Sequence, residues 1–276
     1  MSIQSRLTRL GLAAWLAVSL VPAPARADDL ADKGRAIFLK SRQAVVTLQL
    51  VMKNKISGAG MPSTQSSEAK TDATGTVIDP SGLTVVSLSA TDPSQLLQNM
   101  MSSMSEGDQR FKMESELSDV KILLEDGTEL PAEVVLRDKD LDLAFIRPKT
   151  APPAPMVFVN LATAGKADVL DQLVALNRLG NAAGRSFAAA EERVAAVVQK
   201  PRLFYIPQTS ATPTTLGCPA FTLDGKPLGV FLMRSLKGKG SMNMLSMQPE
   251  NVTGIILPAA EIAKAAAQVP APGAAK

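Results

Sequence analysis

The sequence predicts an all-β fold with one helix near each end. Its strand-like runs, such as residues 44–52, are short and rich in β-branched and aliphatic side chains. Turn sequences separate these runs, among them residues 79–82 (Asp-Pro-Ser-Gly) and the dipeptide Asp126-Gly127. Of the 276 residues, 46% are hydrophobic, which suffices for a packed core.

The first 27 residues are typical of a cleavable secretory signal. Arg6 and Arg9 precede an apolar run at residues 10–21, and a small-residue cleavage pattern ends at Ala27. We expect cleavage after Ala27, a periplasmic or secreted protein, and no membrane span in the mature chain. An uncleaved signal anchor is the alternative, although the run is shorter than the roughly 20 residues that cross a bilayer.

The mature chain is balanced in charge. Three of the 29 Lys and Arg residues lie in the signal, which holds no acid, so 26 remain against 26 Asp and Glu residues. This balance gives no reason to expect binding to nucleic acid or anionic membranes. Cys218 is the only cysteine, so an intramolecular disulfide is excluded.

The first half of the mature chain alternates strands with two insertions. A helical pattern at residues 30–42 precedes the strand at residues 44–52. Residues 53–72 are rich in Gly, Ser, Pro, Gln and charge, which predicts an inserted loop. Strands at residues 74–79 and 83–88 follow. A second insertion at residues 92–117 has the spacing of one apolar helix face, formed by Leu97, Met100, Met101 and Met104.

A hairpin, a strand and a linker come next. Residues 120–124 and 129–136 flank Asp126-Gly127, and residues 140–146 form a further strand. Three prolines within residues 149–155 predict a linker. We therefore expect residues 28–150 to hold the N-terminal helix and the first part of the fold, with both insertions.

The second part of the fold spans residues 151–268. A helix closes it, and a Pro/Ala tail at residues 269–276 is expected to be disordered. The expected strands are residues 171–176, 187–199, 227–233 and 252–257, and the closing helix is residues 258–267.

Four motifs appear in one order along residues 44–268. They are Gly-Thr-Val-Ile-Asp-Pro-Ser-Gly at residues 75–82, Asp-Leu-Ala at residues 142–144, Leu-Gly-Cys-Pro at residues 216–219 before Asp224-Gly225, and Gly-Ile-Ile-Leu-Pro at residues 254–258. In that order they resemble trypsin-like serine proteases of the HtrA type. The resemblance implies two β-barrels, and it ends where an HtrA protein would continue into a peptide-binding PDZ domain.

The resemblance also places the catalytic triad. The histidine position falls on Ser89, the aspartate position on Asp142 and the nucleophile position on Leu216. The chain contains no histidine, and leucine cannot attack a carbonyl group, so we expect no intact triad and no peptidase activity. Asp142 then needs another donor, and we expect the Ser89 hydroxyl group or a water molecule to supply it.

Leu216 and Cys218 allow further interpretations, and an alternative function remains. Leu216 is interpreted as an apolar plug of the former cleft or as a contact for a hydrophobic peptide. Cys218 is interpreted as a small buried hydrophobe, because no histidine is present to activate a thiol. An active endopeptidase with an atypical base, such as a Ser-Lys dyad, is the alternative function.

No cofactor is expected, since the sequence lacks a phosphate-binding glycine loop and a Cys/His cluster. Met242, Met244 and Met247 form a weak candidate for a thioether copper site, which is the third option. The main hypothesis is an exported, non-catalytic protease homologue that binds a polypeptide or serves as a scaffold in the cell envelope. Strand addition or the methionine-bearing insertions would provide the contacts, and the sequence does not predict an oligomeric state.

Overall fold

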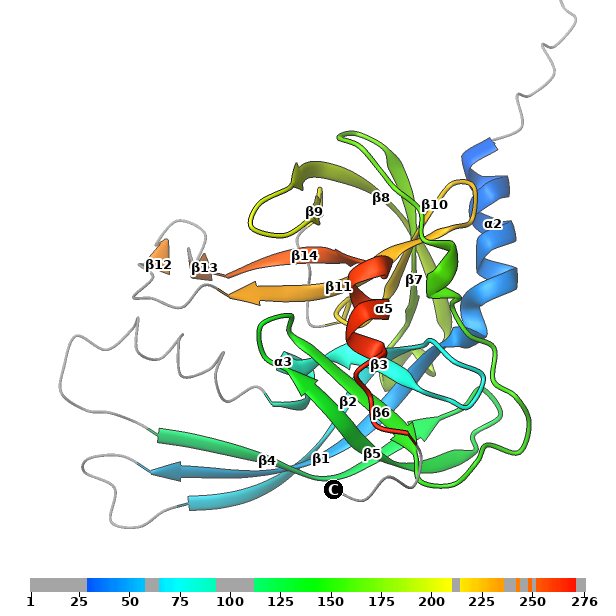
Figure 1. The fold of residues 1–276 in the computed structure, drawn as a ribbon. Helices are drawn as coiled ribbons and strands as arrows, with labels where there is room; N and C mark the ends of the chain where they lie inside the picture. The colour runs from blue at the N-terminus through cyan, green and yellow to red at the C-terminus, as the bar shows by residue number, and fades with distance from the viewer. Residues whose placement is uncertain are drawn as a thin grey trace, which may run out of the picture. The chain divides into compact units, whose positions relative to one another are not determined.

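Strand-forming runs build two closed barrels of six antiparallel strands each (Figure 1). The computed structural model describes residues 29–57, 65–92, 112–209, 214–235, 242–243, 248–249 and 252–271. The predicted all-β, two-barrel fold with a helix near each end is confirmed.

The first barrel has the strand order β1-β2-β3-β6-β5-β4. A short helix, α3 (Leu88–Thr91), follows β3 directly. The six strands are β1 (Val45–Ser57), β2 (Gln65–Val77), β3 (Thr84–Ser87), β4 (Lys112–Leu123), β5 (Glu129–Asp138) and β6 (Leu143–Pro148).

The second barrel has the order β10-β11-β14-β9-β8-β7. Its strands are β7 (Gln172–Arg178), β8 (Phe187–Val198), β9 (Phe204–Pro207), β10 (Pro219–Thr222), β11 (Pro227–Ser235) and β14 (Val252–Pro258). A separate two-stranded pair, β12 (Met242–Asn243) and β13 (Gln248–Pro249), lies between β11 and β14 in the sequence.

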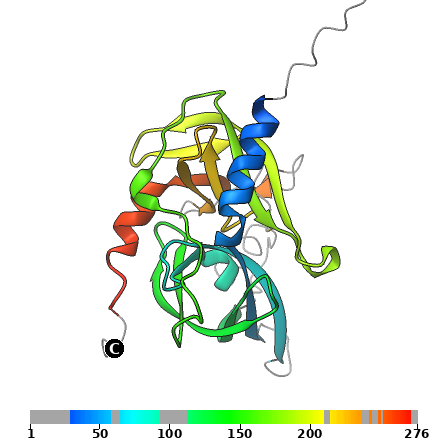
Figure 2. The ribbon, with the colours of Figure 1, turned by 90° about the vertical axis from the view of Figure 1, so that its right-hand side faces the viewer.

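The described residues also contain two longer helices and three 3₁₀ turns. Helix α5 (Ala259–Ala266) packs against β11 and β14 (Figure 2). Helix α2 (Asp29–Ser41) crosses a boundary between two units of the chain, one up to Asp32 and one from Lys33 onward, and the second unit contains both barrels. The 3₁₀ turns are η2 (Arg42–Ala44), η3 (Leu161–Thr163) and η4 (Asn181–Ala183).

Apolar side chains fill both barrels and the space between them. Leu48 is fully buried in the first barrel, and Leu228 is fully buried in the second. A third cluster joins Phe145 of β6 to Leu232 of β11 and Ile262 of α5. The barrels therefore share an apolar interface, which holds the edges of both barrels at fixed positions.

Both predicted insertions are shorter than expected. β1 continues to Ser57 and β2 starts at Gln65, so much of residues 53–72 is strand, and β4 starts at Lys112 inside the second insertion (Figure 1). The composition is polar because these strand ends lie beyond the barrel core. Opposite charges face each other there, with Lys53 opposite both Glu68 and Glu116, and such pairs stabilise a sheet without burial. The predicted helix face with Leu97 lies outside the described residues.

Two further expectations need correction. Strand β9 lies within residues 200–208, a stretch for which no strand was expected. The disordered tail was expected from residue 269, but Val269 packs against the apolar cluster between the barrels, and Nη2 of Arg147 donates a hydrogen bond to the Pro270 carbonyl at 2.6 Å. Residues 272–276 lie outside the described residues.

Candidate functional site

Asp142 lies immediately before β6 and accepts four hydrogen bonds. Its Oδ1 accepts from the Ser89 backbone N–H at 2.8 Å and from the Ser89 hydroxyl group at 2.7 Å. Its Oδ2 accepts from the Ser87 hydroxyl group at 2.6 Å and from the Met233 N–H at 3.0 Å. Met233 belongs to β11, so this carboxylate joins the first barrel to the second.

The carboxylate is held in an unusual setting. Asp142 is 9% exposed, and its φ of 57° places it in the left-handed region that aspartate tolerates better than most residues. Burial raises the pKa of the Asp142 carboxyl group, while the hydrogen bonds from Ser87, Ser89 and Met233 lower it. The polar donors are what allow a carboxylate to occupy this buried position.

Ser89 lies on α3, which the chain enters directly from β3. The expected hydrogen bond from its hydroxyl group to Asp142 is present. The contributions of Ser87 and Met233 were not anticipated. Ser87 could have been considered because it lies only two residues before Ser89. The Met233 donor is a backbone N–H group, which no residue type in the sequence indicates.

The turn before β10 places Leu216 inside the protein. Leu216 is 6% exposed, and Gly217 follows it with a φ of 84°. The Gly217 N–H donates to the Phe231 carbonyl at 2.8 Å, and its carbonyl accepts from the Thr76 hydroxyl group at 2.7 Å. A Cβ atom at Gly217 would lie 2.0 Å from the Thr74 carbonyl oxygen, so only glycine fits. The burial of Leu216 favours the apolar plug over a peptide contact.

Cys218 is buried in the core of the second barrel at 1% exposure. Its Sγ donates to Oδ1 of Asn177 at 3.1 Å. Burial raises the pKa of the thiol well above its ordinary value, so the group stays protonated at neutral pH. A protonated, enclosed thiol cannot serve as a nucleophile in place of Leu216.

The methionine copper candidate is only partly described. Met242 lies in β12, and Met244 and Met247 fall outside the described residues. Where the structure describes side chains, no group of three or more His, Cys, Asp and Glu residues could hold a metal ion. The same described part of the chain contains no helix with the length and apolarity needed to cross a membrane.

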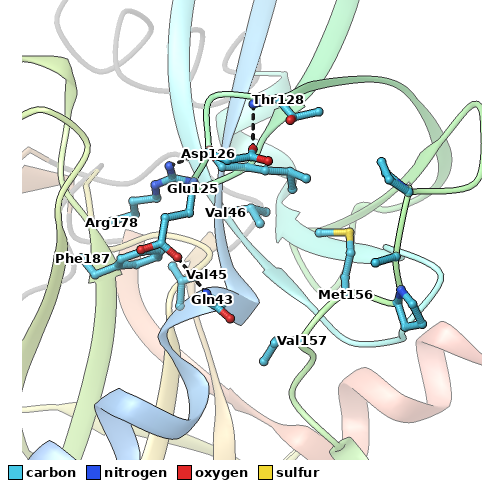
Figure 3. Close-up of a pocket in the computed structure, with 14 residues that line it drawn as sticks. Gln43, Val45, Val46, Glu125, Asp126, Thr128, Met156, Val157, Arg178 and Phe187 are labelled. Atoms are coloured by element: carbon cyan, nitrogen blue, oxygen red, sulfur yellow. Dashed lines mark hydrogen bonds between the residues drawn. The ribbon is translucent and has the colours of Figure 1, made fainter.

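A pocket of about 460 Å³ lies beside the linker between the two barrels, at residues 153–157 (Figure 3). Three parts of the chain form it: the end of η2 with the start of β1, the β4–β5 turn, and residues 153–157 of the linker. Arg178 and Phe187 of the second barrel complete the wall. None of Ser87, Ser89, Asp142 and Leu216 lines it. No motif predicted this pocket, because its walls come from segments far apart in the chain.

Residues 73–230 match the family model described as the trypsin-like peptidase domain, which is more than half of the chain. No curated protein matches the chain. The matched range contains Ser89, Asp142 and Leu216 together with most of both barrels.

Proposed function

Because the chain belongs to the trypsin-like peptidase domain family, we propose that it is a member without peptidase activity, exported to the cell envelope, where it binds a polypeptide partner. The hydrogen bond from the Ser89 hydroxyl group to Asp142 carries this proposal. In an active triad, a histidine imidazole takes that place and accepts the proton of the nucleophile. The hydroxyl group of Ser89 cannot act as such a base near neutral pH.

The residues around the former nucleophile support the same conclusion. Leu216 offers no attacking atom and is buried. The raised thiol pKa of Cys218 and its enclosure in the core argue against a cysteine nucleophile. The chain has no histidine at any of its 276 positions, so no imidazole can be recruited from elsewhere in the sequence.

Strand addition is the binding mode that we favour. Among the described strands, residues 112–119 of β4 pair only with β1, because the pairing of β4 with β5 begins at Val120. Glu116 and Ser118 on this stretch are exposed. A strand with one unpaired edge can accept an extended peptide through backbone hydrogen bonds alone.

Export rests on the sequence of the first 27 residues. The N-terminal sequence of the protein purified from a periplasmic extract of the producing bacterium should begin at Asp28, as cleavage after Ala27 requires. A start at Met1 would instead support the uncleaved anchor.

The binding function can be tested with the mature protein, residues 28–276. Envelope extract is passed over the immobilised protein, captured polypeptides are identified, and hydrogen exchange is compared with and without the purified partner. The proposal predicts slower exchange at residues 112–119. The control is β6 at residues 143–146, which already pairs with β3 on one side and β5 on the other, so its exchange should not change. A partner that is hydrolysed during incubation would contradict the proposal, and protection confined to other segments would contradict strand addition at β4.

A further inference from the structure

We propose that the pocket beside the linker binds the side chain of a lysine or arginine presented by a polypeptide. This site lies outside the cluster around Asp142 and does not depend on the function proposed above. Three properties of the pocket carry the inference: its volume, its apolar walls and the Asp126 carboxylate on its rim.

The walls fit an aliphatic stem. Met156 and Val157 from the linker face Val46 of β1 across the pocket (Figure 3). Pro153 and Pro155 also line the pocket and add apolar surface. Val157 is 38% exposed, so apolar surface is available at the opening. A cavity of about 460 Å³ exceeds the space that one side chain needs and falls within the range of ligand pockets.

The linker wall is fixed to the first barrel. The Met156 N–H donates to the Pro80 carbonyl at 3.0 Å, and the Val159 N–H donates to the Val77 carbonyl at 2.9 Å. These bonds attach the linker to the β2–β3 turn on either side of Val157. The pocket is therefore formed before any ligand arrives, which lowers the entropic cost of binding.

The rim of the pocket is acidic. Glu125 and Asp126 lie together at the β4–β5 turn and line the opening (Figure 3). Oε2 of Glu125 accepts from Nε2 of Gln43 at 2.8 Å, and its Oε1 lies 3.9 Å from Nη2 of Arg42. Asp126 accepts from the Thr128 N–H at 2.9 Å, and among the described residues no lysine or arginine forms an ion pair with it. Hydrogen bonds from Thr128 hold the pKa of Asp126 below its ordinary value, so this group is ionised near neutral pH.

Arg178, the one cation in the lining, interacts electrostatically with Glu125, so Asp126 is the carboxylate left to attract a charged ligand. Its Nη1, Nη2 and Nε donate to the carbonyls of Leu123, Leu124 and Arg185 at 2.6, 3.0 and 3.2 Å. The guanidinium group also lies 5.2 Å from the centre of the Phe187 ring. These bonds hold the guanidinium group in place without removing its positive charge, and the Asp126 carboxylate is the acceptor that the rim offers to a cationic ligand. A cation on an aliphatic stem matches both the rim and the walls.

The experiment uses the mature protein labelled with ¹³C at the methionine methyl groups. Met156 is the only methionine in the pocket lining, and a Met156→Leu variant assigns its signal. The probe is N-acetyl-lysine N′-methylamide, and the matched probe without charge is N-acetyl-norleucine N′-methylamide. We expect a saturable shift of the Met156 signal with the lysine probe and at least about threefold weaker binding of the norleucine probe.

Two variants test the rim. Asp126→Asn keeps the acceptor for Thr128 but removes the charge, and it should weaken the lysine probe about threefold while leaving the norleucine probe unchanged. The control is Asp138→Asn, whose Oδ1 accepts the Asp140 N–H in the same way outside the pocket, and it should change neither affinity. Thermal unfolding verifies that both variants are folded.

Three outcomes would overturn the proposal. They are no Met156 shift up to roughly 50 mM probe, equal affinity for the two probes, and an equal effect of the two Asp→Asn variants. Because the probes are single amino-acid derivatives, these outcomes do not depend on a polypeptide partner for β4. Failure here therefore leaves the test of strand addition intact.

Discussion

The hydroxyl oxygen of Ser89 lies 2.7 Å from Oδ1 of Asp142, in the buried interface between the two barrels. The same carboxylate also accepts the Met233 N–H from the second barrel. Asp142 thus acts as a structural link between the barrels.

Removal of this link should destabilise the protein. Asp142→Ala leaves two serine hydroxyl groups and two backbone N–H groups without their acceptor, and it places alanine at a φ of 57°. We expect a loss of about 2–4 kcal/mol in the free energy of unfolding, measured by urea denaturation. Asp142→Asn, which retains an acceptor and tolerates this backbone, should cost less. Equal losses in the two variants would contradict the assignment of the effect to the acceptor.

The raised pKa of Asp142 predicts a pH dependence with a defined sign. Because the folded protein binds this proton more tightly than the unfolded chain, the stability that the proton provides is present at low pH and is lost as pH rises through the folded pKa. The stability of the wild type minus that of Asp142→Asn should therefore fall as pH rises from about 4 to about 7.

Subtracting the stability of Asp142→Asn from that of the wild type isolates the effect of Asp142. Other carboxyl groups change stability with pH in the opposite direction. The pKa of Asp224 is lowered to about 2, mainly by Lys226, and its contribution is lost as pH falls. That contribution is common to both proteins and cancels. A difference that is constant or rises with pH, from urea denaturation at four or more pH values, would rule out a net raised pKa at Asp142.

The sequence was sufficient for the fold class and for the contact between Ser89 and Asp142. Both follow from local motifs, since the turn at residues 79–82 and the Asp-Leu-Ala start of β6 are short patterns read in order. The outer parts of β1, β2 and β4 were predicted as loops because their residues are polar. Polar composition shows that these residues are not buried, but it does not exclude a strand. Here the strands continue beyond the core because β2 and β4 both pair with β1.

The remaining features depend on tertiary structure. The Met233 donor is a backbone group, and any residue except proline would provide it. The pocket forms where Gln43, Asp126 and Met156 come together from segments far apart in the chain. No periodicity or motif within one segment records such an arrangement.

The placement of Ser89 can be tested with an introduced histidine. Ser89→His would carry the only imidazole in the protein, so its NMR signals need no assignment. Next to the Asp142 carboxylate, we expect the imidazole pKa to lie above its ordinary value of about 6.5. A pKa at or below that value would show that the histidine does not face Asp142. The control is Ser186→His, at an exposed position on the turn before β8.

The turn that holds Leu216 should tolerate no side chain at its glycine. Gly217→Ala introduces a Cβ atom 2.0 Å from the Thr74 carbonyl oxygen at a φ of 84°. Gly184→Ala, at a φ of 62° with nothing within 4 Å, carries the backbone cost without the clash. We expect Gly217→Ala to cost at least about 2 kcal/mol more in urea denaturation. Equal costs would mean that the turn shifts freely around Leu216.

Covalent labelling by a fluorophosphonate tests whether the protein has an activated serine. The probe forms an adduct with the activated serine of an active serine peptidase, and intact mass spectrometry counts adducts on each molecule. If the protein lacks peptidase activity, the mature protein keeps its unlabelled mass under conditions that label active trypsin completely, and casein stays uncleaved. Stoichiometric labelling of one serine, together with casein cleavage that the label abolishes, would contradict the absence of peptidase activity.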